Sequence, residues 1–204
     1  LFDKISLTVD YFHDKRYDQL VSRGDIPVII GIGHSPNNIA ETINQGFDGQ
    51  ISYQDRFGNF DFNTNVVFSY AKNKVKYKAE AQQKYSWLAE TGKPLNQPFG
   101  YKWVGYYTPE DIVKIQSGAK DAPAVPYTDI PVQAGDLKYA DLNNDGTIDD
   151  FDKGAIGKPN LPSTTLGWSF GGYWKGFSFN VLFQGSFDYS FAINGTGIES
   201  FKSQ

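Results

Sequence analysis

Apolar and polar residues alternate along much of the chain with a period of two, which is typical of β-strands whose two faces meet different environments. The clearest example runs from Phe60 to Tyr70, where Phe, Val and Tyr alternate with Asp, Asn and Ser. Four further segments share the pattern, and the segments are close to the roughly ten residues that a tilted strand needs to cross a bilayer. The five segments are residues 5–11, 47–54, 60–70, 166–174 and 177–187. The sequence therefore predicts an all-β protein.

The connections between these segments alternate strictly between long and short. Tight turns at 56–59 and 175–176 join the second strand to the third and the fourth to the fifth, whereas residues 13–45 and 73–164 form long connections. In an up-and-down sheet this order places both long connections on one side and both turns on the other, as in outer-membrane barrels. The pattern predicts an antiparallel up-and-down transmembrane β-barrel segment of about five strands, with long extracellular loops.

The placement of aromatic residues agrees with this interpretation in part. Tyr11, Tyr70, Trp168 and Trp174 lie near the expected strand ends, where barrels carry interfacial aromatic girdles. The alternative fold is a soluble β-sandwich whose apolar faces meet in a core. Alternation alone does not separate the two folds. The loop asymmetry favours the barrel, because a connection of roughly ninety residues is uncommon in a compact domain unless it has structure of its own.

The long segment 73–164 does contain a local helix signal. Thr108 is a suitable N-cap, Pro109 suits the first turn, and Asp111 follows the cap by three residues. Gly118 is expected to end the helix. The apolar side that this short helix would bury consists of Ile112, Val113 and Ile115.

Residues 141–152 carry the most specific chemical pattern in the chain, with oxygen-bearing side chains at the ligand spacing of an EF-hand calcium loop. Gly146 permits the sharp turn, and Ile148 would anchor the loop to the fold through its apolar side chain. Thr147 would contribute its main-chain carbonyl. The expected metal ligands are Asp141, Asn143, Asp145, Thr147, Asp149 and Asp152.

Two departures from an EF-hand indicate a structural ion and not a switch. The closing carboxylate is Asp152, one methylene shorter than the usual Glu, and residues 135–140 do not form an amphipathic helix leading into the loop. The alternative is a solvated turn, which Asp, Asn and Gly build without any metal.

Composition excludes several classes of protein. Of 204 residues, 40% are apolar and 16% aromatic, so the chain is not disordered. The net charge of −4 and the absence of a basic block argue against a nucleic-acid partner. Cysteine is absent, which excludes disulfides and thiolate metal sites.

The sequence offers little for catalysis. His13 and His34 are the only histidines, and neither lies in the spacing of a nucleophilic or zinc site. The acidic pair Asp149 and Asp150 is better explained as an ion ligand and its neighbour than as a glycosidase pair. No enzyme activity and no catalytic residue are therefore predicted.

Several ordered motifs resemble a known family. They are residues 11–18, 44–48, 61–75, 135–149, 152–157 and 171–185. Together they resemble the C-terminal barrel region of SusC/RagA-type TonB-linked outer-membrane proteins of Bacteroidetes. Single motifs such as the aspartate loop recur elsewhere, but the collinear set spans nearly the whole chain.

The resemblance implies a 22-stranded barrel with an N-terminal plug, energised through TonB and capped by a SusD-like surface lipoprotein. Such complexes import oligosaccharides or, in some members, peptides. On this interpretation residues 1–204 are a C-terminal part of the barrel without the plug, and 73–164 is an extracellular loop that holds the calcium loop 141–152. The implied partners are the rest of the barrel and its plug, TonB, the lipoprotein, membrane lipid and an oligosaccharide or peptide substrate.

One alternative function stays open at this point. A soluble calcium-stabilised carbohydrate-binding module could use the Trp and Tyr residues of 85–107 to stack on sugars, although these side chains could equally pack within the loop. No substrate-binding residue is predicted.

Overall fold

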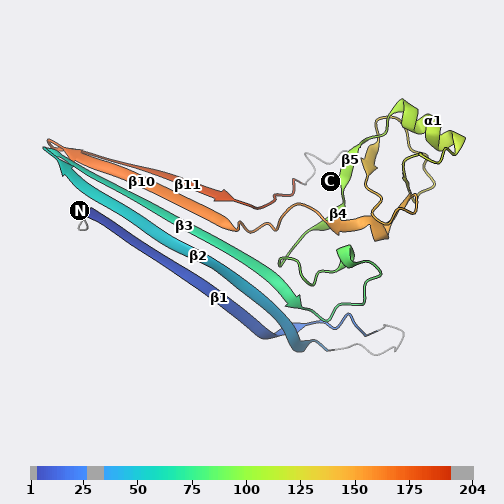
Figure 1. Ribbon diagram of the computed structural model, residues 1–204, viewed down its shortest axis with the longest axis horizontal. Coiled ribbons are helices and arrows are strands. Elements are labelled where there is room, and N and C mark those ends of the chain that lie inside the picture. The colour runs from blue at the N-terminus through green and yellow to red at the C-terminus, as the bar shows by residue number, and fades with distance from the viewer. Residues whose placement is uncertain (1–3, 27–34, 194–204) are drawn as a thin grey trace, which may run out of the picture.

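A computed structural model describes residues 4–26 and 35–193. Its main feature is a five-stranded antiparallel sheet with strand order β1-β2-β3-β10-β11 (Figure 1). The strands are β1 (Ile5–Val21), β2 (Asn37–Phe57), β3 (Phe60–Tyr77), β10 (Thr164–Trp174) and β11 (Phe177–Phe187). Each strand neighbours the next one in this series, so the expected up-and-down topology is confirmed.

Two tight turns form the end of the sheet opposite the long connections. Gly58, with φ 64°, lies in the turn between β2 and β3. Lys175 and Gly176 join β10 to β11 with φ values of 45° and 91°, and two positive φ values in succession match the twist of the flanking strands. Both turns lie where the sequence predicts them.

The first three strands are longer than predicted. β1, β2 and β3 contain 17, 21 and 18 residues, whereas β10 and β11 contain 11 each. The two connections therefore span residues 22–36 and 78–163, and not 13–45 and 73–164. The sequence prediction stopped each strand, at about the length of a bilayer crossing, where the apolar positions give way to polar ones such as His13, Gln45 and Lys72. Polar side chains are compatible with strand pairing outside a bilayer.

The connection 78–163 has its own small elements, as its length requires. It contains three two-stranded pairings, β4 with β9, β5 with β7, and β6 with β8. Their bounds are η3 (Ser86–Leu88), β4 (Phe99–Tyr101), β5 (Trp103–Tyr106), α1 (Pro109–Ser117), β6 (Val125–Pro126), β7 (Leu137–Tyr139), β8 (Thr147–Ile148), η4 (Asp150–Asp152) and β9 (Lys153–Ala155). Figure 1 shows this connection beyond the end of the sheet, on the side opposite the tight turns.

The helix α1 forms as predicted, with one correction. Thr108 and Asp111 make a complete capping box, and Gly118 ends the helix in the left-handed conformation. The expected burial of Val113 is wrong, because its side chain is 64% exposed, while Ile112 and Ile115 are half-buried. A nine-residue helix lying on one side of a small loop domain covers only a narrow stripe.

Buried side chains gather in two places, both outside the part of the sheet where all five strands are paired. Ala40, Val75 and Ala79 are buried where the ends of β2 and β3 meet the connection. Tyr107, Ile148 and Asp152 are buried within the connection itself. No helix among the described residues has both the length and the apolar character to cross a membrane.

Candidate functional site

The register of the sheet sorts the side chains into one apolar and one polar face. Residues directly opposite each other in a ladder share a face, and successive residues point to opposite faces. Ile51, for example, lies between Leu7 and Val66, and Val66 lies opposite Trp168. The apolar face includes Ile5, Leu7, Val9, Phe47, Ile51, Val66, Phe68, Leu166, Trp168, Phe170, Phe179, Val181 and Phe183.

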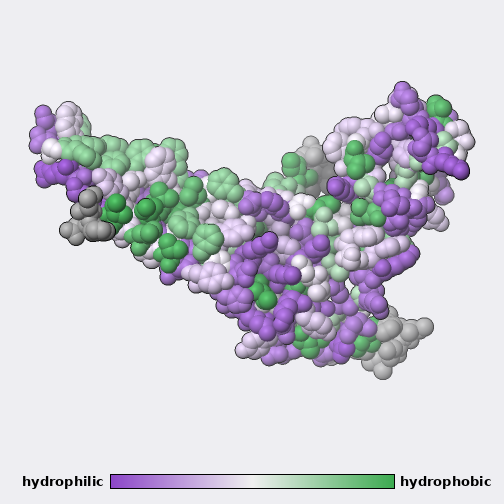
Figure 2. All heavy atoms as spheres, viewed as in Figure 1, coloured by the Kyte–Doolittle hydropathy of each residue, from purple (hydrophilic) through white to green (hydrophobic). Residues whose placement is uncertain are grey.

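This apolar face lies open on the described chain. Leu7 is 64% exposed and Phe183 is 55% exposed, and hydrophobic side chains gather over the left half of the sheet in Figure 2. Its polar groups are satisfied internally: Trp168 Nε1 donates to Thr64 Oγ1 at 2.9 Å, and that hydroxyl donates to the Ser169 carbonyl at 3.0 Å. Such closed pairing is what a face without water requires.

Aromatic rows bound the apolar face at both ends. Tyr11, Phe47 and Tyr70 share one row, which also meets Thr164 at the start of β10. The 11 residues of β10 span about 35 Å along the strand, or about 25 Å of bilayer at a tilt near 45°. The expected position of Tyr11 and Tyr70 near strand ends is wrong, because β1 and β3 continue well beyond them. Both residues lie instead at the level where β10 begins, which is one edge of this apolar band.

The turn end carries the second aromatic row. Trp174 pairs with Phe60 on one side and Phe177 on the other, so its expected position near a strand end is confirmed. The expected position of Trp168 near a strand end is wrong, because it lies in the middle of β10, stacked on Phe183 with ring centroids 5.7 Å apart. The prediction started this strand at residue 166, whereas β10 begins at Thr164.

The opposite face of the sheet is polar and hollowed. A hollow of about 450 Å³ crosses all five strands and includes polar side chains from each of them, with Gln184 contributed by β11. Among them are Thr8, Asp10, Asp48, Gln50, Ser69 and Thr165. Nearby, Ser52 donates to Asn65 Oδ1 at 2.8 Å across the β2–β3 ladder. This face suits contact with water or with polar protein surface.

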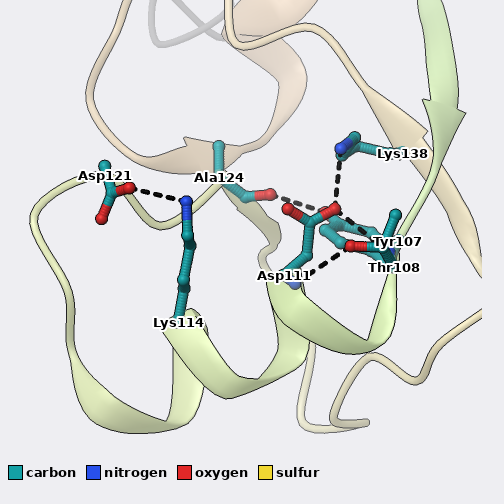
Figure 3. A network of polar contacts seen from close by, with 7 residues as sticks. All are labelled: Tyr107, Thr108, Asp111, Lys114, Asp121, Ala124 and Lys138. Atoms are coloured by element: carbon teal, nitrogen blue, oxygen red, sulfur yellow. Dashed lines mark hydrogen bonds and ion pairs between the residues drawn. The ribbon is translucent and has the colours of Figure 1, made fainter.

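A polar network fixes α1 to the rest of the connection (Figure 3). Asp111 accepts the Thr108 amide at 3.1 Å and pairs with Lys138 Nζ at 2.8 Å, and the Thr108 hydroxyl accepts the Asp111 amide. The buried Tyr107 donates its hydroxyl to the Ala124 carbonyl at 2.6 Å. The Lys138 hydrogen bond, followed by that of the Thr108 amide, holds the pKa of Asp111 below its ordinary value.

The predicted calcium loop curls as its sequence requires. Asp141 accepts the Gly146 amide at 2.8 Å, and Gly146 itself has φ 85°. Ile148 is 5% exposed and β8 pairs with β6, so the predicted anchoring role of Ile148 is confirmed. The amides of Val125 and Tyr127 bond the carbonyls of Gly146 and Ile148, and alternation along the extended chain turns the Thr147 carbonyl away from β6.

The carboxylates of this loop are engaged by main-chain amides. Asp145 accepts the Thr147 amide at 2.9 Å and Asn143 Nδ2 at 2.8 Å, and Asp149 accepts the Phe151 amide at 2.8 Å. Asp152 is fully buried and accepts the amides of Leu142 and Asp149 at 2.7 and 2.9 Å. Across residues 4–26 and 35–193, no three carboxylate or histidine side chains converge as a metal site.

Aromatic residues of 85–107 divide into packed and exposed groups. Tyr85 stacks on Trp87 with centroids 4.5 Å apart, and Trp87 Nε1 donates to the Phe151 carbonyl at 2.8 Å. Trp103 and Tyr106 are more than half exposed and lie edge to face. Packing within the loop therefore accounts for the first group and not for the second.

One of the two histidines, His13, lies among the described residues. His13 lies within β1, and its Nδ1 is 3.2 Å from Gln45 Oε1 on the next strand. His34 lies outside the described residues.

Lysines on β3 form a further group that the sequence analysis overlooked. Every second residue from Lys72 to Lys78 is a lysine, and period two places those within β3 on one face. The signal was present in the sequence, but the segment was read as loop.

The fold and the two-faced sheet agree with the comparison to protein families. Residues 1–196 match the model of the TonB dependent receptor-like β-barrel. The chain belongs to this family. Its members reside in the bacterial outer membrane, so the apolar face is the surface toward lipid and the polar face is the surface toward the barrel interior.

Solved structures of peptide importers share this fold. The RagAB peptide importer in its "closed-closed" state matches with a TM-score of 0.60 and 19% identity, over 91% of this chain and 19% of that chain. Its "open-open" state matches with a TM-score of 0.61 and 17% identity, over 92% of this chain and 19% of that chain. No curated protein matches the sequence. This chain thus spans about a fifth of the importer chains.

These comparisons decide between the two folds left open by the sequence. The expected resemblance to SusC/RagA-type proteins is confirmed at the level of family and fold. The soluble β-sandwich is not what the structure shows, because no second sheet packs on the apolar face within the described residues. The sheet is an open segment of barrel wall.

Proposed function

We propose that this chain forms part of the wall of a TonB-dependent outer-membrane importer of oligopeptides or glycans. The observation that carries the proposal is the sheet with an apolar face about one bilayer high and a hollowed polar face, in a chain of the TonB-dependent receptor family. The similar RagAB structures are described as a peptide importer, which supports import. The proposed activity is transport and not catalysis.

The proposed partners follow from the two edges of the sheet, its polar face and the connection 78–163. The edges β1 and β11 would pair with the remaining barrel strands, because unpaired edges are not tolerated in lipid. The polar face would meet the plug or the cargo. TonB would act through a region outside residues 1–204. The ordered connection 78–163, with Trp103 and Tyr106 exposed, is the external surface proposed for docking a SusD-like lipoprotein.

A growth and uptake experiment on the full-length protein tests the import function. Cells lacking the gene are supplied with the wild type or with a variant in which 78–163 is replaced by a short linker. We expect the wild type alone to restore uptake of labelled oligopeptide or oligosaccharide and to co-purify the lipoprotein. Correct barrel assembly of both proteins, checked by heat-dependent gel mobility, is the control. The proposal would be contradicted if cells without the gene took up both cargo classes as fast as cells supplied with the wild type.

We also propose that residues 141–152 hold one structural calcium ion. Support comes from the ligand spacing, from the curl around Gly146 and from the Thr147 carbonyl, which is directed away from β6. The carboxylate oxygens that accept amides keep further lone pairs for an ion. When bound, calcium would offset part of the conformational entropy lost in ordering the loop.

The substitution Asp145→Ala tests the calcium assignment. We expect loss of the bound calcium measured by elemental analysis and faster hydrogen exchange in residues 135–157, with the exchange of β1–β3 unchanged. Asp150→Ala, at a side chain 84% exposed, is the matched control. Unchanged calcium occupancy in Asp145→Ala would rule out this ligand set.

A further inference from the structure

The lipid-facing side of β1–β3 continues beyond its aromatic row into a basic surface. The side chains that follow the row of Tyr11, Phe47 and Tyr70 on this face are His13, Gln45 and Lys72, and then Lys15, Ile43 and Lys74. We call these two rows the basic rows. In Figure 2, the green region of the sheet gives way to mainly purple side chains where the strands continue.

Lys72 and Lys74 carry positive charges without a counterion. Both are exposed, and among the described residues neither side chain has a hydrogen bond or an ion pair. By contrast, Lys76 and Lys15 share Glu41, at 2.9 and 3.8 Å. Like charges on one strand face repel each other, so an anion placed between Lys72 and Lys74 would be stabilised.

A hollow of about 360 Å³ lies at these two lysines. It is lined by His13, Lys72 and Lys74, with Gly92 and Pro94 as one wall, and no Asp or Glu contributes to its lining. The wall is fixed to β3, because the Gly92 amide donates to the Val75 carbonyl at 2.8 Å. The hollow is therefore a built feature with donors and no competing carboxylate.

The level of the hollow identifies the kind of anion. It begins one row beyond the aromatic row, at the boundary of the apolar band of about 25 Å. At that level a lipid presents its headgroup while its acyl chains lie against the apolar face. The long stem of a lysine can follow an apolar surface and place its ammonium group at this boundary.

We propose that the basic rows bind the phosphate group of a membrane lipid headgroup. Lys72 and Lys74 supply the charge, and His13 and Gln45 supply polar contacts beside them. The acyl chains of the same lipid lie over Tyr11, Phe47 and Tyr70. The proposal rests on the outer-membrane location of the barrel and is independent of the cargo.

An acidic protein surface is the competing occupant. The geometry favours lipid, because the hollow opens on the face directed to the membrane and continues the apolar band. A docking partner of the external connection would meet Trp103 and Tyr106 instead, which lie on β5.

Native mass spectrometry of the full-length protein in neutral detergent tests the proposal. The probes are phosphatidic acid, diacylglycerol with the same acyl chains, and inorganic phosphate. The variant Lys72→Gln/Lys74→Gln is compared with Lys102→Gln/Lys120→Gln, which removes the same charge from the external connection. We expect phosphatidic acid to bind the wild type and the control alike, and to bind the Lys72/Lys74 variant about tenfold to thirtyfold more weakly.

Three results would overturn the proposal. Equal binding of diacylglycerol and phosphatidic acid by the wild type would exclude recognition of phosphate. Inorganic phosphate that binds as tightly as phosphatidic acid would exclude a lipid as the source. Unchanged phosphatidic acid binding by the Lys72/Lys74 variant, with loss of its lipoprotein partner, would assign the basic rows to protein docking. Uptake is measured separately, so failure here leaves the import function to its own test.

Discussion

In the sheet, large apolar side chains are exposed over one face, whereas in the connection 78–163 the buried groups include a tyrosine and a carboxylate with specific hydrogen bonds. All buried side chains of the described residues lie outside the bilayer-level part of the sheet. The two regions are therefore stabilised by different interactions. The sheet depends on lipid and on neighbouring strands, while the connection is specified by its own caps, turns and polar pairs.

The largest expected effect comes from testing the two faces at adjacent identical residues. Val66 points to the apolar face and lies between Ile51 and Trp168, whereas Val67 is 41% exposed on the polar face. Val66→Lys should destabilise the full barrel by about 2–4 kcal/mol, because it places a charge in lipid near the middle of the band. Val67→Lys should cost less than about 1 kcal/mol, since its charge stays in water.

Unfolding of both Val66 and Val67 variants by urea in lipid vesicles measures this difference. Equal destabilisation by the two substitutions would contradict the assignment of the faces.

A second substitution tests whether the connection is held by its internal polar pairs. Asp152→Ala leaves the amides of Leu142 and Asp149 without their buried acceptor, at a cost of about 2 kcal/mol within the connection. Hydrogen exchange of these two amides, measured in the presence of a calcium chelator, should accelerate. The exchange of β1–β3 should not change, and faster exchange there would show that the two regions unfold together.

Removing the helix cap should have a smaller effect. Thr108→Ala deletes the hydroxyl that accepts the Asp111 amide and should destabilise α1 by about 1 kcal/mol. Thr108→Ser keeps the hydroxyl and should retain the helix. Amide exchange across Pro109–Ser117 in the full protein distinguishes the two variants; equal protection in both would show that the cap contributes nothing.

The smallest expected effect is a pH dependence confined to the connection. Because the pKa of Asp111 is lowered in the folded state, its carboxylate stabilises the fold above its ordinary pKa. That contribution is lost as the pH falls through the lowered folded pKa, when the bonds to Lys138 and Thr108 weaken. Protection of α1 should therefore decrease in acid below about pH 4. Asp111→Asn should remove this dependence, and an unchanged profile in that variant would assign it to another group.

The comparison also explains how far the sequence predicted the structure. Period-two segments such as 60–70 identified strands and their faces, because alternation follows directly from strand geometry. The helix cap at Thr108 was recognised because capping is local. The ends of β1–β3 were missed, because the bilayer length was used as a limit for strands that continue into water.

Contacts between distant residues could not be predicted from spacing. The bond from Tyr107 to Ala124 and the pair of Asp111 with Lys138 depend on how the connection folds back on itself. The calcium ligands stay a prediction, because the same Asp and Asn spacing also forms amide-capped turns. The basic rows were readable in the alternation of lysines from Lys72 to Lys78, once that segment is known to be a strand.

One face of the sheet meets lipid and the other meets the barrel interior. Residues 1–204 contain no cysteine, so single cysteines placed at 64 to 69 introduce the one thiol of this region. In the full protein, with any cysteine elsewhere replaced, they can be spin-labelled for collision measurements in lipid vesicles. We expect labels at 64, 66 and 68 to collide mainly with oxygen dissolved in lipid, and labels at 65, 67 and 69 mainly with a water-soluble nickel complex. Uniform accessibility along 64–69, or the opposite alternation, would contradict this assignment of the two faces.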